Sequence, residues 1–472
     1  MTKSILGRTW VQLILLVAVC ALLFFSNLDR RALWPPDEPR YFSIARETLD
    51  HGDWILLNKD GQVYTDKPPL FFWLVAFSSV LWQGLDTFSA RFPSALFATI
   101  SVVLTFFLGR TLFSPGVGFI AGLVLATTPQ FAWLAGRVNI DATLTCFTTL
   151  AFFSFVSWCL GRNEPTPGRK REVLLLGFYG GMALGTLTKG PVGFILPLIV
   201  CATYILLRRD WYLVRDMRLV AGGALFTVVV LLWYVPASLQ GGESFLRETL
   251  LRHSVQRFAQ GIDHSAPLYF YVERFPPGFF PWVMFFPSAI FLAMSGQKGK
   301  ERERLMFPLV WFASIFAFCS ISAEKRDLYL LPLLPAAALL VGKVLHDFIV
   351  GGVSRPCRPL ILIPGVLIGF FFALAGIASF WLSIRGFGDV VPHLTVAALA
   401  ITGCGIALLG FGTFRRQLAA FLVLVLIVGG IFFYTQRYLF SGFEDVKTLR
   451  STIRQNAANI GWPVMSATRP VE

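Results

Sequence analysis

Long apolar runs recur along nearly the whole chain and limit this protein to a small set of folds. Of its 472 residues, 55% are hydrophobic and 14% are charged, whereas globular proteins carry about 25% charged residues. An apolar run of about 20 residues is long enough to cross the hydrocarbon core of a bilayer as a helix. The sequence therefore predicts an all-α integral membrane protein that crosses the bilayer many times.

Hydropathy and length predict thirteen membrane-crossing helices. Their ranges are 10–28, 92–112, 117–135, 142–160, 173–188, 190–207, 219–239, 279–294, 305–322, 328–346, 359–382, 394–414 and 418–434. With this count, the short loops richest in Lys and Arg all fall on the side of the N-terminus, which the positive-inside rule makes cytoplasmic. The net charge of +14 then reflects membrane topology and does not indicate a nucleic-acid partner.

A shorter apolar run, residues 70–84, is predicted to lie at the outer surface as an interfacial or re-entrant segment. As a helix it would reach roughly 22 Å, less than the roughly 30 Å of the hydrocarbon core. If it crossed, the charge pattern of every later loop would invert. We therefore expect two long outer segments, 29–90 and 240–278. The first also contains an amphipathic surface helix, whose apolar face is formed by Tyr41, Ile44, Ala45 and Thr48.

Asp37 is the main catalytic candidate, because it opens the motif Asp37-Glu38-Pro39-Arg40-Tyr41 at the outer membrane edge. A carboxylate there can take a proton from an acceptor hydroxyl, or orient that hydroxyl, in group transfer. An Asp before Glu-Pro is also a good helix N-cap, so both interpretations stay open. Asp141 falls on the same side, at the start of a predicted span, and has the same two interpretations.

Five cationic side chains are predicted at the membrane depth of Asp37, and together they form a plausible receptor for a lipid phosphate. They are Arg40, Lys67, Lys189, Lys325 and Arg326. Lys67 is held before two prolines, which favour an extended backbone, although a snorkelling lysine is the alternative. Asp66 and His253 can bind a divalent metal ion; a hydrogen-bonding His on a polar helix face is the alternative.

The sequence has no nucleotide-binding fingerprint. The long loops are predicted outside, where nucleotides are scarce, so an energised donor would arrive attached to a lipid. The phosphate receptor would then bind the leaving group of that donor.

At these residues the chain resembles the polyprenyl-phosphate-dependent glycosyltransferases with the GT-C fold. The likeness is to the family 39 and 83 types, in particular the bacterial aminoarabinose (lipid A) transferases and their relatives in the protein O-mannosyltransferase superfamily. It rests on residues 37–41, residues 64–69, Asn139 with Asp141, Thr188-Lys189-Gly190, and Lys325 through Tyr329 to Pro332. It implies a GT-C transmembrane domain over residues 1–434, with the first outer loop carrying the catalytic motif. Residues 435–472 are expected to form a short periplasmic tail.

The resemblance also implies roles for individual residues. Asp37 and Asp141 would be catalytic. Asp66 and His253 would be positions of a metal contact; the family has a glutamate where this chain has Asp66, so the metal remains an open prediction. Lipid-phosphate binding is expected of Arg40, Tyr41, Tyr64, Lys67, Lys189, Lys325, Arg326 and Tyr329, supported by Glu38, Asn139 and Arg257.

The function expected from the residues and the resemblance is transfer of a sugar from undecaprenyl phosphate to a periplasmic acceptor, by direct displacement with inversion. Lipid A or a related envelope lipid is the first acceptor to consider, and a protein is another. The enzyme, a pentosyl- or hexosyltransferase, is expected in the bacterial inner membrane, with its N-terminus cytoplasmic and its active site and C-terminus periplasmic. A polyprenyl-linked sugar flippase and an O-antigen-type glycan ligase are the alternatives; the clustering of acidic and basic residues on one face favours an enzyme.

Overall fold

The computed structural model describes residues 8–161, 168–249, 265–295, 299–384, 393–413 and 416–439. Two predicted site residues, His253 and Arg257, lie outside these ranges, as does the predicted tail after residue 439. The elements, in chain order, are α1 (Thr9–Cys20), η2 (Ala21–Phe25), α2 (Asp37–His51), β1 (Asn58–Lys59), β2 (Gln62–Val63), α3 (Leu70–Leu81), α4 (Thr87–Leu112), α5 (Pro115–Ala126), α6 (Pro129–Ala135), α7 (Ile140–Leu160), α8 (Gly168–Lys189), α9 (Val192–Arg208), α10 (Tyr212–Asp216), α11 (Leu219–Leu246), α13 (Phe270–Gly278), η5 (Trp282–Phe285), α14 (Phe286–Ser295), α15 (Lys300–Ile321), η6 (Asp327–Leu333), α16 (Leu334–Ile349), η7 (Arg355–Cys357), α17 (Pro359–Leu382), α19 (Leu394–Thr413), α20 (Gln417–Tyr434) and η9 (Thr435–Leu439).

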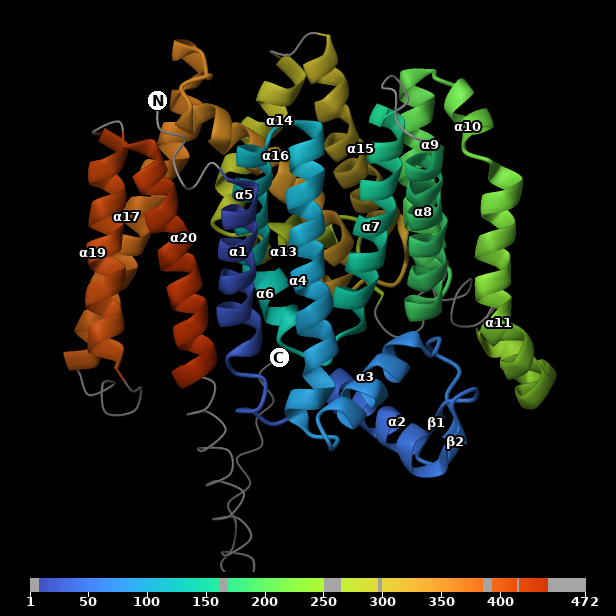
Figure 1. Cartoon of the computed structure of the whole chain (residues 1–472). Coiled ribbons are helices and arrows are strands. Elements are labelled where there is room, and N and C mark those ends of the chain that lie inside the picture. Colours follow the sequence, from blue (N-terminus) through green and yellow to red (C-terminus); the bar gives the residue numbers. More distant parts are fainter. Residues whose placement is uncertain are drawn as a thin grey trace, which may run out of the picture.

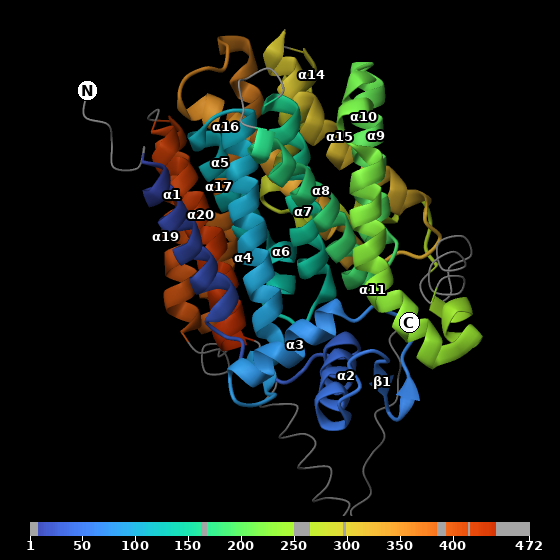
Figure 2. The same ribbon diagram turned by 45° about the vertical axis from the view of Figure 1, so that its right-hand side comes forward.

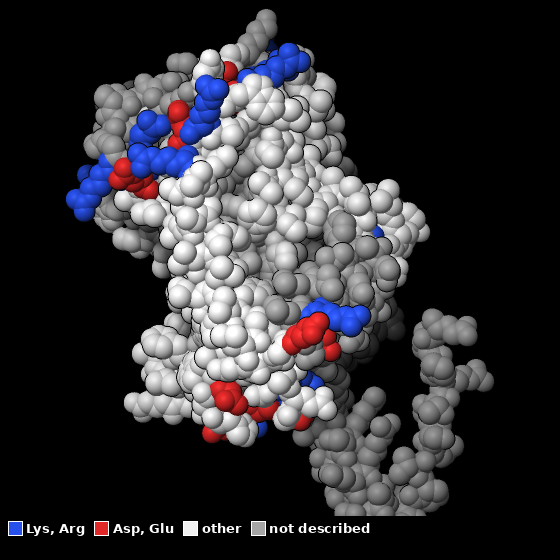
Figure 3. Space-filling model, turned by 90° about the vertical axis from the view of Figure 1, so that its right-hand side faces the viewer, with Lys and Arg blue, Asp and Glu red and all other residues white. Residues whose placement is uncertain are grey.

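Long helices lie side by side and make up most of the molecule (Figure 1). Helices α2 and α3 and the antiparallel pair β1–β2 lie together at one end of this bundle (Figures 1 and 2). On the face drawn in Figure 3, charged side chains gather toward the two ends and the band between them is formed mostly by uncharged residues. Because charged side chains are costly in the hydrocarbon core, this distribution is that of a bundle embedded in a bilayer.

The number of helices that can cross a membrane is a matter of length and composition. Among the described residues, seven helices are long and apolar enough to cross, or up to nine if each of two bent pairs counts as one span. Four further apolar helices have 10–17 residues, shorter than the ~20 residues of a full span. The chain is thus a multi-pass membrane protein. Each predicted range contains a helix, and the count of thirteen crossings stays a prediction.

Two helix pairs are sharply bent. The first lies within the predicted span 117–135, and the second joins α13, which falls in the predicted outer segment 240–278, to the helices of the predicted span 279–294. Helices α5 and α6 meet at an angle of 68° just before Pro129, and α13 meets the helix that follows it at 110°. Prolines explain both breaks, since a proline has no N–H to donate and its ring clashes with the preceding turn. In a membrane, such irregular backbone is tolerated where it lines a cavity, and residues of both α6 and α13 line the larger of the two cavities described below.

The amphipathic surface helix predicted in the first outer segment is confirmed as α2. Its buried face contains the predicted residues Tyr41, Ile44, Ala45 and Thr48, and also Glu38. The Tyr41 ring packs edge-on against Phe71 and Phe72 of α3, with ring centroids 5.8 and 5.6 Å apart. Helix α3 has only 12 residues and lies beside α2 at the end of the bundle (Figure 1), which agrees with the prediction that residues 70–84 do not cross.

A buried ion pair anchors the start of α2 to the bundle. Arg91 of α4 and Glu38 are 0% and 2% exposed, and Arg91 Nε donates to Glu38 Oε1 at 2.8 Å. The same carboxylate accepts from the backbone N–H groups of Trp34 and Val138, each at 2.8 Å. Three chain segments that are distant in sequence are therefore joined next to Asp37.

Candidate active site

A polar cavity of about 290 Å³ lies where α2 meets the ends of the long helices. Its lining brings together residues from sequence positions 36 to 329: Pro36, Asp37, Arg40, Tyr41, Asp66, Lys67, Asp141, Lys189, Glu324, Arg326, Leu328 and Tyr329. Four of these side chains are cationic and four are carboxylates, so among the described lining residues the formal charges cancel. Most of the residues predicted for one site are thus gathered around one cavity.

Asp37 is the first residue of α2, and Pro36 occupies the N-cap position. The alternative of Asp37 as a helix N-cap is therefore not what the structure shows. Its carboxylate instead pairs with Arg40, one turn further along α2, and with Arg326, which directly precedes η6. Burial alone would raise the pKa of Asp37, but the hydrogen bonds and charges of Arg326 and Arg40 outweigh it and hold the pKa below its ordinary value. Asp37 is therefore ionised at neutral pH.

Asp141 and Lys189 form a second ion pair, across two helices. Asn139 caps α7 by accepting from the Ala142 backbone N–H at 3.0 Å, which leaves Asp141 in the first turn with its carboxylate in the cavity rather than capping the helix. Lys189 is the last residue of α8, and its Nζ lies 4.3 Å from the centroid of the Tyr329 ring. Asn139 therefore supports the site indirectly: it caps α7 and so fixes the turn that carries Asp141.

Lys67 and Asp66 form a third pair, with Nζ and Oδ1 2.7 Å apart. Tyr64 does not line the cavity; its hydroxyl donates to Asp66 Oδ2 at 3.3 Å. Both Asp66 oxygens therefore accept from neighbouring side chains, which fits a metal ligand poorly. Among the described residues, no group of three or more His, Cys, Asp or Glu is placed to hold a metal ion. His253, the other predicted metal ligand, lies outside the described residues.

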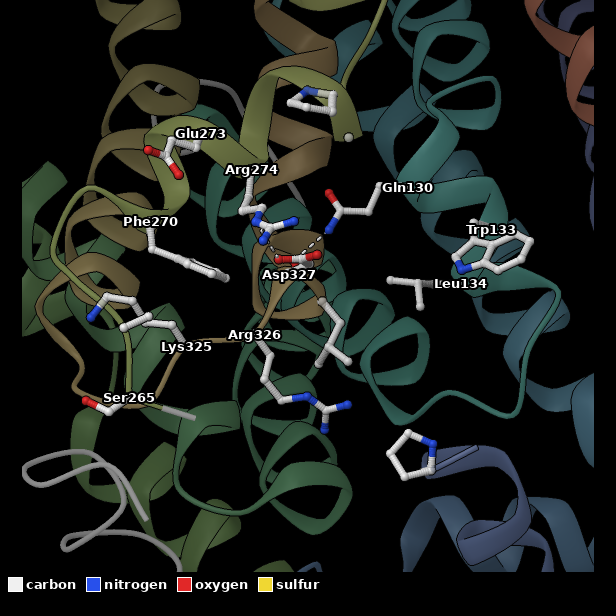
Figure 4. A pocket seen from close by; sticks show the side chains of 15 residues that line it. Gln130, Trp133, Leu134, Ser265, Phe270, Glu273, Arg274, Lys325, Arg326 and Asp327 are labelled. Carbon is white, nitrogen blue, oxygen red and sulfur yellow. Dashed lines mark hydrogen bonds and ion pairs between the residues drawn. The ribbon is translucent and has the colours of Figure 1, made fainter. Parts of the chain in front are cut away.

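Lys325 faces a different cavity from its neighbour Arg326. It lines a larger cavity of about 990 Å³, which shares Pro36, Arg326 and Leu328 with the polar one. In Figure 4 the side chains of Lys325 and Arg326 point in different directions from the same segment. Adjacent residues in an extended segment project to opposite sides. The prediction that Lys325 and Arg326 bind the same phosphate is therefore wrong for Lys325, which does not line the polar cavity.

The sequence analysis did not identify two residues that matter for the site, Glu324 and Arg91. Glu324 lines the polar cavity and accepts from the Tyr329 hydroxyl at 3.2 Å; its position directly before Lys325 and Arg326 was the available signal. Arg91 is fully buried and holds Glu38 in place. It falls just before the predicted span 92–112, where arginines commonly serve as membrane anchors, so sequence offered no reason to single it out.

The geometry suits binding of a phosphate group. Arg40, Lys67, Lys189 and Arg326 all border one enclosed volume, and each pairs with a carboxylate. An incoming phosphate would exchange with those carboxylates as the partner of the cations. Guanidinium groups bind phosphate oxygens with two parallel hydrogen bonds, and the pairs keep the cations in place until then.

Comparison with known proteins places the chain in a family. The family model for dolichyl-phosphate-mannose-protein mannosyltransferases matches residues 66–234. An uncharacterized protein of Aquifex aeolicus is 31% identical over 338 residues, which cover 71% of this chain and 64% of that protein. A Pseudomonas fluorescens undecaprenyl phosphate-alpha-4-amino-4-deoxy-L-arabinose arabinosyl transferase is 28% identical, over 84% of this chain and 70% of its own length.

A solved structure decides the matter. The crystal structure of ArnT from Cupriavidus metallidurans bound to undecaprenyl phosphate superposes with a TM-score of 0.74 at 25% identity, over 94% of this chain and 78% of that one. The chain belongs to the polyprenyl-phosphate-dependent GT-C glycosyltransferases. This GT-C protein spans just under two thirds of the Aquifex relative and 58% of a second Pseudomonas fluorescens transferase. The predicted GT-C fold is thereby confirmed, together with the predicted family.

Proposed function

We propose that this chain transfers a sugar from an undecaprenyl-phosphate donor to an acceptor at the outer face of the bacterial inner membrane. The observation that carries the proposal is the polar cavity, in which Asp37 and Asp141 lie among four cations. The likeness to an undecaprenyl-phosphate-bound ArnT supports the donor. Relatives named as 4-amino-4-deoxy-L-arabinose transferases support an amino-pentose as the sugar. Lipid A, or a related envelope lipid, is the proposed acceptor.

The proposed reaction is a single displacement. An acceptor oxygen attacks the anomeric carbon, the bond from that carbon to the phosphate oxygen breaks, and its electron pair leaves with undecaprenyl phosphate. The configuration at the anomeric carbon inverts. Arg40, Lys67, Lys189 and Arg326 would stabilise the negative charge that develops on the leaving phosphate, since these four cations already border one cavity.

The role of Asp37 depends on the acceptor oxygen. A hydroxyl acceptor must lose its proton, and Asp37 would take it as general base. The low pKa of Asp37 makes it a weak base while both arginines hold it. A phosphate acceptor is already ionised and needs no base, and Asp37 would then position Arg326 beside the reacting groups.

We place the polar cavity on the periplasmic side and the N-terminus in the cytoplasm. The support is the charge of the connecting loops, because the basic segments 208–218 and 349–358, which the structure describes, lie at the end of the bundle opposite α2 and α3 (Figure 1). On this assignment residues 1–434 act as one transmembrane transferase domain.

The substitution Asp37→Asn tests the proposal. It removes the charge while keeping the shape, and Asp50→Asn, at an exposed position of the same helix, is the matched control. In membranes supplied with labelled undecaprenyl-phosphate sugar and lipid A, we expect transfer to fall about 100-fold or more in the first variant, as for loss of a catalytic proton-transfer group, and to be unchanged in the second. Transfer by Asp37→Asn near the wild-type rate would contradict the assignment, and lipid movement without covalent transfer would identify a flippase.

A further inference from the structure

The larger cavity adjoins the polar one and has a different character. It has a volume of about 990 Å³, at the upper end of the ~300–1,000 Å³ typical of small-molecule sites. The two cavities share Pro36, Arg326 and Leu328, and Arg326 is bonded to Asp37. A molecule in the larger cavity can therefore extend one end to the catalytic carboxylate. The polar cavity, at about 290 Å³, is too small for both substrates.

The walls of the larger cavity come from the two bent helix pairs. Gln130, Trp133 and Leu134 belong to α6, and Phe270, Glu273 and Arg274 to α13. Both helices lie within the length of the bundle rather than at its ends (Figure 1). Arg274 and Asp327 form an ion pair of 3.7 Å, and their side chains remain 54% and 56% exposed. Exposed charges at this depth occur where protein encloses a water-filled space, so this cavity is built for a polar occupant.

The lining has the mixture of groups that a sugar ring requires. Trp133 and Phe270 offer aromatic surface, while Gln130, Ser265, Glu273 and the Arg274–Asp327 pair offer hydrogen-bond donors and acceptors around it (Figure 4). A saccharide presents apolar C–H faces together with hydroxyl groups, which match both kinds of surface. A polyprenyl chain would instead strip water from the ion pair without replacing its hydrogen bonds, which is unfavourable.

Trp133 is held in place from outside the cavity. The guanidinium of Arg137 lies 3.7 Å from the centroid of the Trp133 ring and 5.0 Å from that of Trp34. Arg137 is only 8% exposed, so its guanidinium is buried against the Trp133 ring and adds a cation–π attraction. Trp34 is not among the residues that line the larger cavity. The arrangement leaves Trp133 little freedom, which lowers the entropy cost of ordering it on a ligand.

We propose that the larger cavity binds the saccharide part of a glycolipid acceptor, with Trp133 as the aromatic surface on which a sugar ring stacks. The inference rests on the proposed transferase function and names the acceptor site that this function requires. Bound there, the acceptor would present its reacting oxygen past Arg326 to Asp37. Trp133 is a binding residue in this proposal and takes no part in the bond changes.

The test compares Trp133→Ala, Trp133→Phe and Trp34→Ala in the full-length protein, with lipid A as acceptor and undecaprenyl-phosphate aminoarabinose as donor. We expect Trp133→Ala to raise the acceptor KM up to about tenfold, since aromatic contacts contribute about 0.5–1.5 kcal/mol, with the donor KM unchanged. Trp133→Phe keeps a ring and should recover most of the loss. Trp34→Ala removes the other tryptophan of the stack but keeps the Trp133 ring, so it should raise the acceptor KM much less than Trp133→Ala does.

Each other result overturns the inference. An unchanged acceptor KM in Trp133→Ala would show that no acceptor stacks on this ring. Equal effects of Trp133→Ala and Trp34→Ala would mean that only the packing around Arg137 matters, and a raised donor KM would assign the cavity to the donor. If a polypeptide and not lipid A accepts the sugar, the saccharide assignment is wrong. Failure of the wild-type protein to consume the donor would instead refute the proposed function, and the inference with it.

Discussion

The ion pair between Glu38 and Arg91 allows a sharp test of how the site is held. Arg91 is 0% exposed and makes five hydrogen bonds: two to Glu38 and one each to the carbonyl oxygens of Leu28, Arg31 and Ala32. Substituting Arg91→Met keeps an unbranched apolar side chain and removes all five. It leaves a buried carboxylate without its charged partner, and breaking such a pair costs about 3–5 kcal/mol.

The change should also reach the chemistry, because Glu38 is the neighbour of Asp37 in the first turn of α2. A misplacement of about 1 Å at a reacting group can lower a rate by about 100-fold. We therefore expect Arg91→Met to lower both the Tm of the purified protein and its rate of sugar transfer. The exposed substitution Arg46→Met, on the same helix as Glu38, is the control and should change neither.

The assay is thermal unfolding in detergent at one fixed scan rate, run on Arg91→Met, Glu38→Gln and the double variant. Partners in a buried pair are not additive, so the double variant should be more stable than the sum of the single changes predicts, by about 0.5–3 kcal/mol. Strict additivity would refute the coupling. A Tm shift for Arg91→Met no larger than that for Arg46→Met would refute the anchoring role of the pair.

Two further predictions concern the polar cavity. Lys67→Ala should raise the donor KM, because one cation of the phosphate site is lost, whereas Lys59→Ala, in the neighbouring β1, should not; steady-state kinetics with varied donor distinguish them, and equal values would contradict the phosphate role of Lys67. Arg326→Met should raise the pKa of Asp37, since burial raises it and Arg326 lowers it. Activity that needs ionised Asp37 would then be lost at a higher pH as the solution is acidified, and an acid limb of the pH–rate profile that does not move would contradict this account.

The amino-acid sequence alone determined the class of fold and most of the members of the site. Apolar runs of span length leave few options in a bilayer, because every backbone polar group must be satisfied within the protein. The helical spacing of apolar residues in α2 predicts its buried face, and Tyr41 and Ile44 are indeed buried on it. Charge in the connecting loops indicated which residues share one membrane face, and that was enough to group Asp37, Asp141 and Lys189.

Only the tertiary structure decided the partners of these residues. A membrane face is a plane, and residues on it can lie far apart or in contact, so sequence could not distinguish Arg326, which pairs with Asp37, from Lys325, which turns to the larger cavity. Asp37 could have been a helix cap, and the position of Pro36 settled that it is not. The bent helix pairs that open the larger cavity depend on how prolines bend packed helices. The direction in which each helix bends follows from how it packs against its neighbours, and a hydropathy profile of the sequence carries no information about that packing.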